Sequence, residues 1–153
     1  MTTELNKTYQ TILNNSAWEF PLNHAMLATR IIADFKGENL KIFDMTKGGV
    51  LCDYNVVATA QNTTQAKAMV DEIGRTFRKI EVKIQSVEGY GSADWILFDT
   101  GDIIIHVFQE STRDVYDLDH VFGERPLIKI PDEFYFGAAT PTTRENDNLK
   151  GFF

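Results

Sequence analysis

The chain has 153 residues with a formal net charge of −7; 43% of them are hydrophobic and 24% charged, which is typical of one globular domain and excludes a disordered chain. No apolar run reaches the roughly 18 residues of a membrane span, and the first 29 residues hold one basic residue, so we expect a cytoplasmic protein without a targeting segment. The single cysteine, Cys52, excludes an intramolecular disulfide and a cysteine-cluster metal site.

The N-terminal half predicts helices and strands in alternation. Residues 1–19 are polar and weakly patterned, and we expect a short helix or a loose extension there. From Pro21 to Phe35 apolar residues recur at helical spacing, and Lys36 and Gly37 form a suitable end. Further along, the patterns predict strands over 40–45 and 54–60, joined by a polar, glycine-containing connection, and a helix over 63–79.

The C-terminal half predicts three strands and one helix. Alternation over 80–87 indicates a half-exposed strand, residues 94–108 read as a hairpin, and a helix follows from Ser111, its expected cap, to Phe122. Residues 127–136 are too apolar for a free linker, so we expect them to pack, and the last dozen residues to be mobile. The order predicts an α/β fold with a mixed five-stranded sheet flanked by helices.

The hairpin sorts its side chains into two faces. If Thr100 and Gly101 form a two-residue turn, Trp95 lies opposite His106 and Leu97 opposite Ile104. The mixed face then carries aromatic, acidic and histidine side chains, which suits either a surface packed under a helix or a surface that meets a partner. The apolar face holds Ile96, Phe98, Ile103, Ile105 and Val107, and the mixed face holds Trp95, Leu97, Asp99, Asp102, Ile104, His106 and Phe108.

Negative charge is concentrated in residues 88–124. This segment has nine acidic residues against Arg113 alone, a net charge of −8. Phosphates would be repelled there, so we expect no direct sequence-specific nucleic-acid binding, and a basic partner is the natural complement. The alternative is a solvated acidic surface that only keeps the protein soluble.

Catalytic patterns are incomplete. Gly91 and Ser92 followed by Asp99 and Asp102 are similar to the loop and metal-binding acids of nucleotidyltransferases, but such acids stand two apart on one strand, whereas these flank a turn. Ser92 lacks a nucleophile-elbow context, and Lys47 is followed by only part of a phosphate loop. We therefore expect no enzyme activity and no cofactor. The histidines His24, His106 and His120 show no ligand spacing, so we expect no metal site either.

One stretch resembles a known family. Residues 91–118, GSADWILFDTGDIIIHVFQESTRDVYDL, closely resemble the ribosomal silencing factor family, also called the Iojap family. Upstream, residues 34–45 and the acid-aromatic pair Asp53-Tyr54 match as well. The resemblance covers roughly residues 22–123, so we expect an N-terminal extension over 1–20, the family domain over 21–123 and a C-terminal tail over 124–153.

The resemblance implies a fold and a function. The fold is nucleotidyltransferase-like without the catalytic acids. The function is to bind ribosomal protein fourteen of the large subunit, block association with the small subunit and repress translation, with related organelle members aiding large-subunit biogenesis. Carried over by position, the partner-binding residues are Tyr54, Asp94, Trp95, Phe108, Gln109, Glu110, Arg113 and Tyr116.

Two other functions stay open. The runner-up is a nucleotide-binding or nucleotidyltransferase enzyme that retained the activity of its ancestral fold. A weaker alternative is a homodimer of the free protein, formed through the same aromatic face, because exposed apolar patches seldom stay uncovered.

Overall fold

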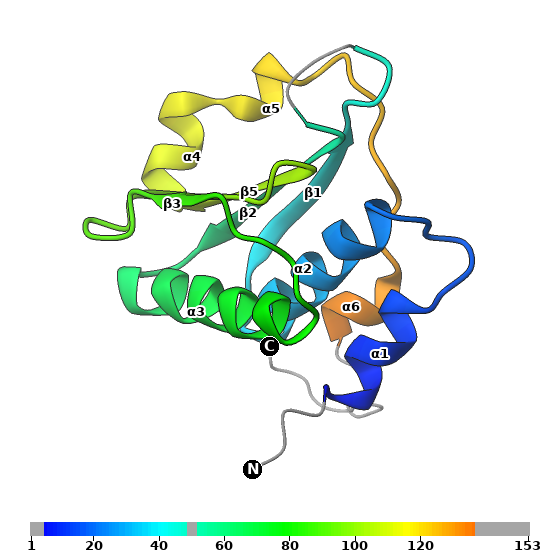
Figure 1. Cartoon of the computed structure of the whole chain (residues 1–153). Helices are drawn as coiled ribbons and strands as arrows, with labels where there is room; N and C mark the ends of the chain where they lie inside the picture. The colour runs from blue at the N-terminus through cyan, green and yellow to red at the C-terminus, as the bar shows by residue number, and fades with distance from the viewer. Residues whose placement is uncertain (1–4, 49–51, 137–153) are drawn as a thin grey trace.

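A five-stranded mixed sheet forms the centre of the computed structural model, which describes residues 5–48 and 52–136 (Figure 1). The strand order is β1-β2-β5-β4-β3, in which β2 and β5 are parallel and the other neighbours antiparallel. The predicted fold class is confirmed. The strands are β1 (Glu38–Asp44), β2 (Tyr54–Ala60), β3 (Ser86–Glu88), β4 (Trp95–Asp99) and β5 (Ile103–Gln109).

Helices cover the two faces of the sheet unequally. In Figure 1, α2 and α3 lie with α1 and α6 on one side of the sheet, while the short helices α4 and α5 lie on the other. Among the described residues, no helix has the length and apolar character to cross a membrane. The helices are α1 (Lys7–Leu13), α2 (Leu22–Asp34), α3 (Thr63–Lys79), α4 (Glu110–Tyr116), α5 (Leu118–Val121) and α6 (Asp132–Phe136).

The main core lies between the sheet and the pair α2 and α3, and we call this side the closed face. Helix α3 has the predicted bounds because Asn62 caps it, its side chain accepting a hydrogen bond from the Gln65 amide at 2.8 Å. The helix buries one apolar stripe, and β4 and β5 supply the apolar hairpin face predicted from the alternation. Fully buried members include Met69, Ile73, Phe77, Ile96, Ile103, Ile105 and Val107.

The strand predicted over 80–87 is wrong for most of its length. Only Ser86–Glu88 pair with β4, although Ile80, Val82 and Ile84 do pack against the core. The physical reason is the short partner strand. Because Ser86 pairs with Asp99, where β4 ends and the turn begins, residues before Ser86 have no strand beside them.

The hairpin register differs from the prediction by two residues. The two turn residues are Gly101 and Asp102, and Gly101 has a φ of +93°, which glycine adopts readily at the first position of a two-residue turn. Trp95 therefore pairs with Phe108, and His106 with Leu97. A shift of two keeps every side chain on its face, so the predicted division into two faces is confirmed for the strand residues.

The single helix predicted over 111–122 is wrong. Asp117 adopts a left-handed conformation with φ of 51° and separates α4 from α5. Ser111 is not the cap either, because α4 begins one residue earlier, after Gln109. Asp117 instead caps α5, its side chain accepting a hydrogen bond from the His120 amide at 3.3 Å.

Segments outside the sheet and its two long helices also pack. Trp18 contacts Phe134 of α6, with ring centroids 6.2 Å apart, and the Tyr9 hydroxyl donates to Asp34 of α2 at 3.1 Å. Near the C-terminus, the Ile128 amide donates to the Ile42 carbonyl at 2.9 Å, which covers the β1 edge of the sheet. The expected packing of 127–136 is confirmed, and the last dozen residues lie outside the described part.

Candidate partner-binding face

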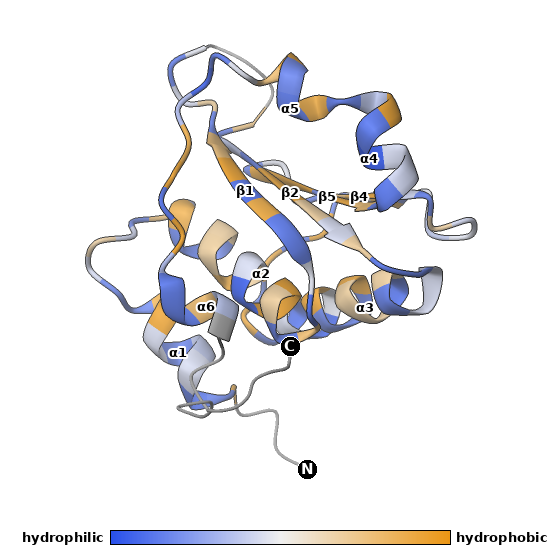
Figure 2. Ribbon diagram, turned by 180° about the vertical axis from the view of Figure 1, so that it is seen from behind, coloured by the Kyte–Doolittle hydropathy of each residue, from blue (hydrophilic) through white to orange (hydrophobic). Residues whose placement is uncertain are grey.

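The sheet side that carries α4 and α5 is only partly covered, and we call it the open face. A small apolar cluster lies there under the two helices, separate from the main core. Figure 2 shows hydrophilic residues over much of α4, in contrast to the apolar strands. The cluster contains Phe43, Met45, Cys52, Val57 and Phe108, with Trp95, Ile104, Leu118 and Phe122 packed against it.

Three aromatic side chains form a stack that rises from this cluster to the surface. Phe108 is fully buried, Trp95 is half-buried above it with ring centroids 4.9 Å apart, and Tyr116 of α4 lies 4.7 Å from Trp95. Tyr116 is 50% exposed. The stack therefore offers the Trp95 and Tyr116 rings to a partner while Phe108 supports them from below.

A buried hydrogen-bond chain fixes Trp95. The indole Nε1–H donates to Nδ1 of His106 at 3.1 Å, and Nε2 of His106 lies 2.9 Å from Oδ1 of Asn55. Since Nδ1 accepts, the proton sits on Nε2, which donates to Asn55. Burial lowers the pKa of His106 to about 4, in agreement with a neutral ring. The indole N–H points inward, so a partner meets only the apolar ring of Trp95.

Ion pairs hold α4 and α5 against the sheet. The buried guanidinium of Arg113 donates to Asp119 at 2.9 and 3.1 Å and to the Thr59 hydroxyl of β2 at 2.8 Å. Lys41 of β1 lies 2.9 Å from the same carboxylate. Hydrogen bonds from Arg113 and Lys41 lower the pKa of Asp119 to about 2. This arrangement stabilises the helix pair that carries Tyr116.

The turn before β4 presents an acid beside the stack. The Gln109 amide donates to the Asp94 carbonyl at 3.1 Å, and the Gln109 side chain donates to the Ala93 carbonyl at 2.9 Å. These bonds tie the start of β4 to the end of β5. The side chains of Asp94 and Glu110 remain exposed near Trp95, so the aromatic stack has an acidic rim.

The structure brings six of the predicted partner-binding residues together at one end of the sheet around Trp95. It leaves out Tyr54, which starts β2 and packs against the main core, whereas Phe108 pairs with Thr59 near the other end of that strand. Phe108 and Arg113 are buried and can only support a contact from beneath. The six are Asp94, Trp95, Phe108, Gln109, Glu110 and Tyr116, with Arg113 holding the helix behind them.

Sequence reasoning missed two exposed apolar residues on α4 and α5. Val115 is 75% exposed and Val121 is 65% exposed. In a single helix over 111–122 the two would lie six residues apart on different sides, so no apolar stripe signals them. The break at Asp117 is what presents both residues on these short helices, and Asp117 offers only a weak sequence signal for it.

The described residues contain no metal-ligand cluster, and two of the groups considered for catalysis have structural roles or a protonated thiol. Within 5–48 and 52–136, no three His, Cys, Asp or Glu side chains cluster as metal ligands would. Asp99 stabilises the turn, its carboxylate accepting from the Gly101 amide at 2.7 Å. Burial raises the pKa of Cys52 to about 11, so its thiol stays protonated and is a poor nucleophile.

Comparisons with known proteins point to one family. The family described as "ribosomal silencing factor during starvation" matches residues 20–150. A ribosomal silencing factor from Chromobacterium violaceum is 32% identical over 116 residues, which cover 75% of this chain and 90% of that protein. A mouse protein named for mitochondrial assembly of the ribosomal large subunit is 23% identical over 103 residues, covering 60% of this chain and 45% of that protein.

A solved structure agrees with the fold. The crystal structure of a protein from Chromobacterium violaceum superposes with a TM-score of 0.63 at 28% sequence identity. The match covers 71% of this chain and 93% of that one.

Proposed function

The chain belongs to the ribosomal silencing factor family, and on that premise we propose that it binds the large ribosomal subunit and keeps the small subunit from joining it, which lowers translation. The observation that carries the proposal is the aromatic stack of Trp95 and Tyr116 on the open face. An exposed aromatic pair over a rigid base is the usual form of an interface anchor. The mouse relative's name supports the choice of the large subunit.

The proposed contact on the large subunit is ribosomal protein fourteen. The acids Asp94 and Glu110 are exposed at the adjoining ends of the two strands that carry the stack, Asp114 is exposed on α4, and Val115 and Val121 add exposed apolar surface on α4 and α5. Such a face suits a protein partner that offers apolar groups within a basic surrounding. Because Trp95 uses its N–H internally, the partner has no hydrogen bond to make to the indole and packs on the ring instead.

The proposal is non-enzymatic. The described site holds a neutral buried histidine and a turn-forming aspartate, and both have structural partners. The action follows from occupancy: a protein bound on the joining surface of one subunit excludes the other by volume. Its potency is then set by its affinity and concentration.

Co-sedimentation and subunit joining test the proposal. The full chain is mixed with purified large or small subunits and pelleted, and separated subunits are then rejoined with and without it. We expect the chain to pellet with large subunits alone and to reduce the joined fraction in proportion to occupancy. Tyr116→Ala should weaken both effects about five- to thirtyfold, the cost of truncating an exposed interface aromatic.

Tyr135→Ala serves as a matched control, because Tyr135 is 49% exposed, close to the 50% of Tyr116, but lies on α6, across the sheet from α4 and α5. It should pellet and block joining as the unmodified chain does. A chain that leaves subunit joining unchanged at saturating occupancy would overturn the proposal.

A further inference from the structure

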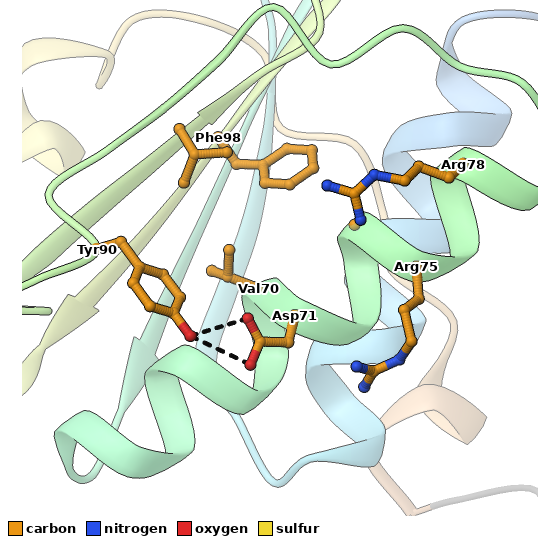
Figure 3. Close-up of a pocket in the computed structure, with 8 residues that line it drawn as sticks. Val70, Asp71, Arg75, Arg78, Tyr90 and Phe98 are labelled. Atoms are coloured by element: carbon orange, nitrogen blue, oxygen red, sulfur yellow. Dashed lines mark hydrogen bonds between the residues drawn. The ribbon is translucent and has the colours of Figure 1, made fainter.

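A pocket of about 280 Å³ lies between α3 and the β3 edge of the sheet, on the closed side and so across the sheet from α4 and α5. Its apolar lining comes from Val70, Val87 and Phe98 (Figure 3). The main core lies beneath it, since Phe98 is buried and packs edge-on against Phe77. The pocket is therefore a surface hollow with the packed core as its floor.

The two ends of the pocket differ in charge. At one end the Tyr90 hydroxyl lies 3.0 and 3.2 Å from the two carboxylate oxygens of Asp71, which it joins by hydrogen bonding. At the other end Arg78 extends toward Phe98, while Arg75 points away from Tyr90 and pairs with Glu72 (Figure 3). The pocket thus has an acceptor end and a cationic end.

Arg78 is available for a ligand. Among the residues that the structure describes, its guanidinium has no hydrogen bond or ion pair, although that of Arg75 one turn away is paired. Gly74 gives its guanidinium room, because a Cβ on that glycine would stand 3.2 Å from Nη1 of Arg78. Arg78 is exposed, and its guanidinium lies beside the apolar lining, where a ligand can reach it.

The surroundings of this pocket are basic, unlike the open face. Residues 63–85 carry five basic and three acidic side chains, a net charge of +2, in a chain whose net charge is −7. Lys67 lies 5.3 Å from the Tyr90 ring centroid, and Lys79 and Lys83 are exposed beyond Arg78. A polyanion that the open face repels is attracted here.

We propose that this pocket binds one unpaired nucleotide of an RNA strand. Arg78 takes the phosphate, the base packs on Val70, Val87 and Phe98 beside Tyr90, and Asp71 accepts a hydrogen bond from a base amino or imino group. The Asp71 carboxylate repels phosphate, which fixes the direction of the nucleotide in the pocket. The inference deepens the proposed function and rests on it, because the partner it adds is the RNA of the same subunit.

A strand of RNA fits the pocket and its charged surroundings better than a peptide. A peptide would use the pocket for one side chain, and it could pair with the cations along α3 only through acidic residues at a matching spacing. A polynucleotide places a phosphate every few ångströms, so Lys67, Lys79 and Lys83 can each contact the same strand. Binding at both faces would then orient the protein, with the acidic face on a basic protein and the basic edge on RNA.

The test is fluorescence anisotropy of the full chain with a labelled single-stranded RNA of about ten nucleotides and mixed sequence at about 0.05 M salt. Arg78→Ala should weaken binding about tenfold and lower the salt dependence by about one phosphate contact. Tyr90→Ala should weaken it by at least fivefold with the salt dependence unchanged. Lys129→Ala, which removes one exposed positive charge near the opposite edge of the sheet, is the matched control and should bind as the unmodified chain.

Three results would overturn the inference. Equal losses of RNA affinity in Arg78→Ala and Lys129→Ala would indicate attraction by diffuse charge, and binding of nucleoside monophosphates without binding of the RNA would exclude a strand. Variants that no longer bind isolated ribosomal protein fourteen but still bind RNA would indicate a peptide ligand. Thermal melts of each variant show whether it is folded. Because the RNA assay contains no ribosomes, its failure leaves the subunit-joining result standing, and the reverse holds too.

Discussion

The closed and open faces of the β4–β5 hairpin are built by alternate residues of the same two strands, yet they have different physical characters. On the closed face Ile96, Ile105 and Val107 are fully buried under α2 and α3. On the open face Trp95 and Ile104 are half-buried beneath two short helices. The closed face therefore provides folding free energy, while the open face retains surface that a partner can still cover.

The polar groups differ in the same way. The open face contains the chain Trp95, His106 and Asn55 and the ion pairs of Arg113 and Asp119, whereas the hairpin residues of the closed face are apolar. Directional bonds hold exposed side chains in one geometry, which apolar packing alone does less well. The exposed side chains of a binding surface must therefore be held in place by hydrogen bonds and ion pairs with the residues beneath them.

The largest expected effect separates two adjacent isoleucines. Ile105→Ala on the closed face should lower the free energy of unfolding by about 2 to 5 kcal/mol, because it leaves a cavity in the main core. Ile104→Ala on the open face should cost about 1 kcal/mol, since the site can collapse toward solvent. Urea denaturation of both variants measures the difference. Equal losses would show that the two faces do not differ in burial as described.

A pH effect comes next and belongs to the open face. Folded His106 stays neutral down to a pKa of about 4, whereas the unfolded imidazole takes a proton near 6.5. The unfolded state therefore binds more protons between these values, and the free energy of unfolding should fall by up to about 3 kcal/mol as pH is lowered from 6.5 to 4. His106→Gln removes this proton uptake, so its stability should decline less over the same range in urea melts.

If the pH profiles of His106→Gln and the unmodified chain run parallel between pH 6.5 and 4, His106 is not buried and neutral, and the support for Trp95 fails.

A smaller effect is expected at the ion pair that holds α4 and α5. Asp119→Asn should lower stability by about 1 to 2 kcal/mol at neutral pH, because Arg113 keeps only Thr59 as a partner. The folded pKa of Asp119, about 2, lies below its ordinary value of 3.8, so its contribution is present above pH 4 and is lost as pH falls toward 2. The variant and the unmodified chain should therefore converge near pH 2 in denaturant melts, and a constant gap would contradict the ion pair.

The smallest effect concerns rate rather than stability. The acids of residues 88–124 should steer the protein to a basic partner, so association with large subunits should slow as salt rises from about 0.05 to 0.5 M. Stopped-flow fluorescence can follow this step. An on-rate that does not depend on salt would show that these acids are only a solvated surface.

Sequence patterns correctly predicted the element bounds and faces that depend on the local spacing of apolar residues. Helix α3 and strand β2 have the predicted bounds because α3 buries one apolar stripe along its length and β2 is a short apolar run buried on both faces. The hairpin faces were predicted despite a wrong register, since an error of two residues preserves alternation. Periodicity is a local property, and it survives errors in pairing.

The wrong predictions concern features that depend on contacts with residues distant in the sequence. The strand expected over 80–87 shortened because β4 ends at Asp99, and nothing in the segment itself records the length of its neighbour. Tyr54 left the site because parallel pairing places it at the far end of β2 from Trp95. The break at Asp117, and with it the exposure of Val115, depends on one left-handed residue.

The central claim is that Trp95 anchors a partner on the open face, and one variant tests it most directly. Trp95→Ala is measured twice, by urea denaturation and by co-sedimentation with large ribosomal subunits. We predict that binding weakens about thirty- to a thousandfold, or about 2 to 4 kcal/mol, while stability falls by less, because Trp95 is only half-buried. The folded variant should then let separated subunits rejoin. A stably folded Trp95→Ala that still blocks joining at the concentrations of the unmodified chain would contradict the account.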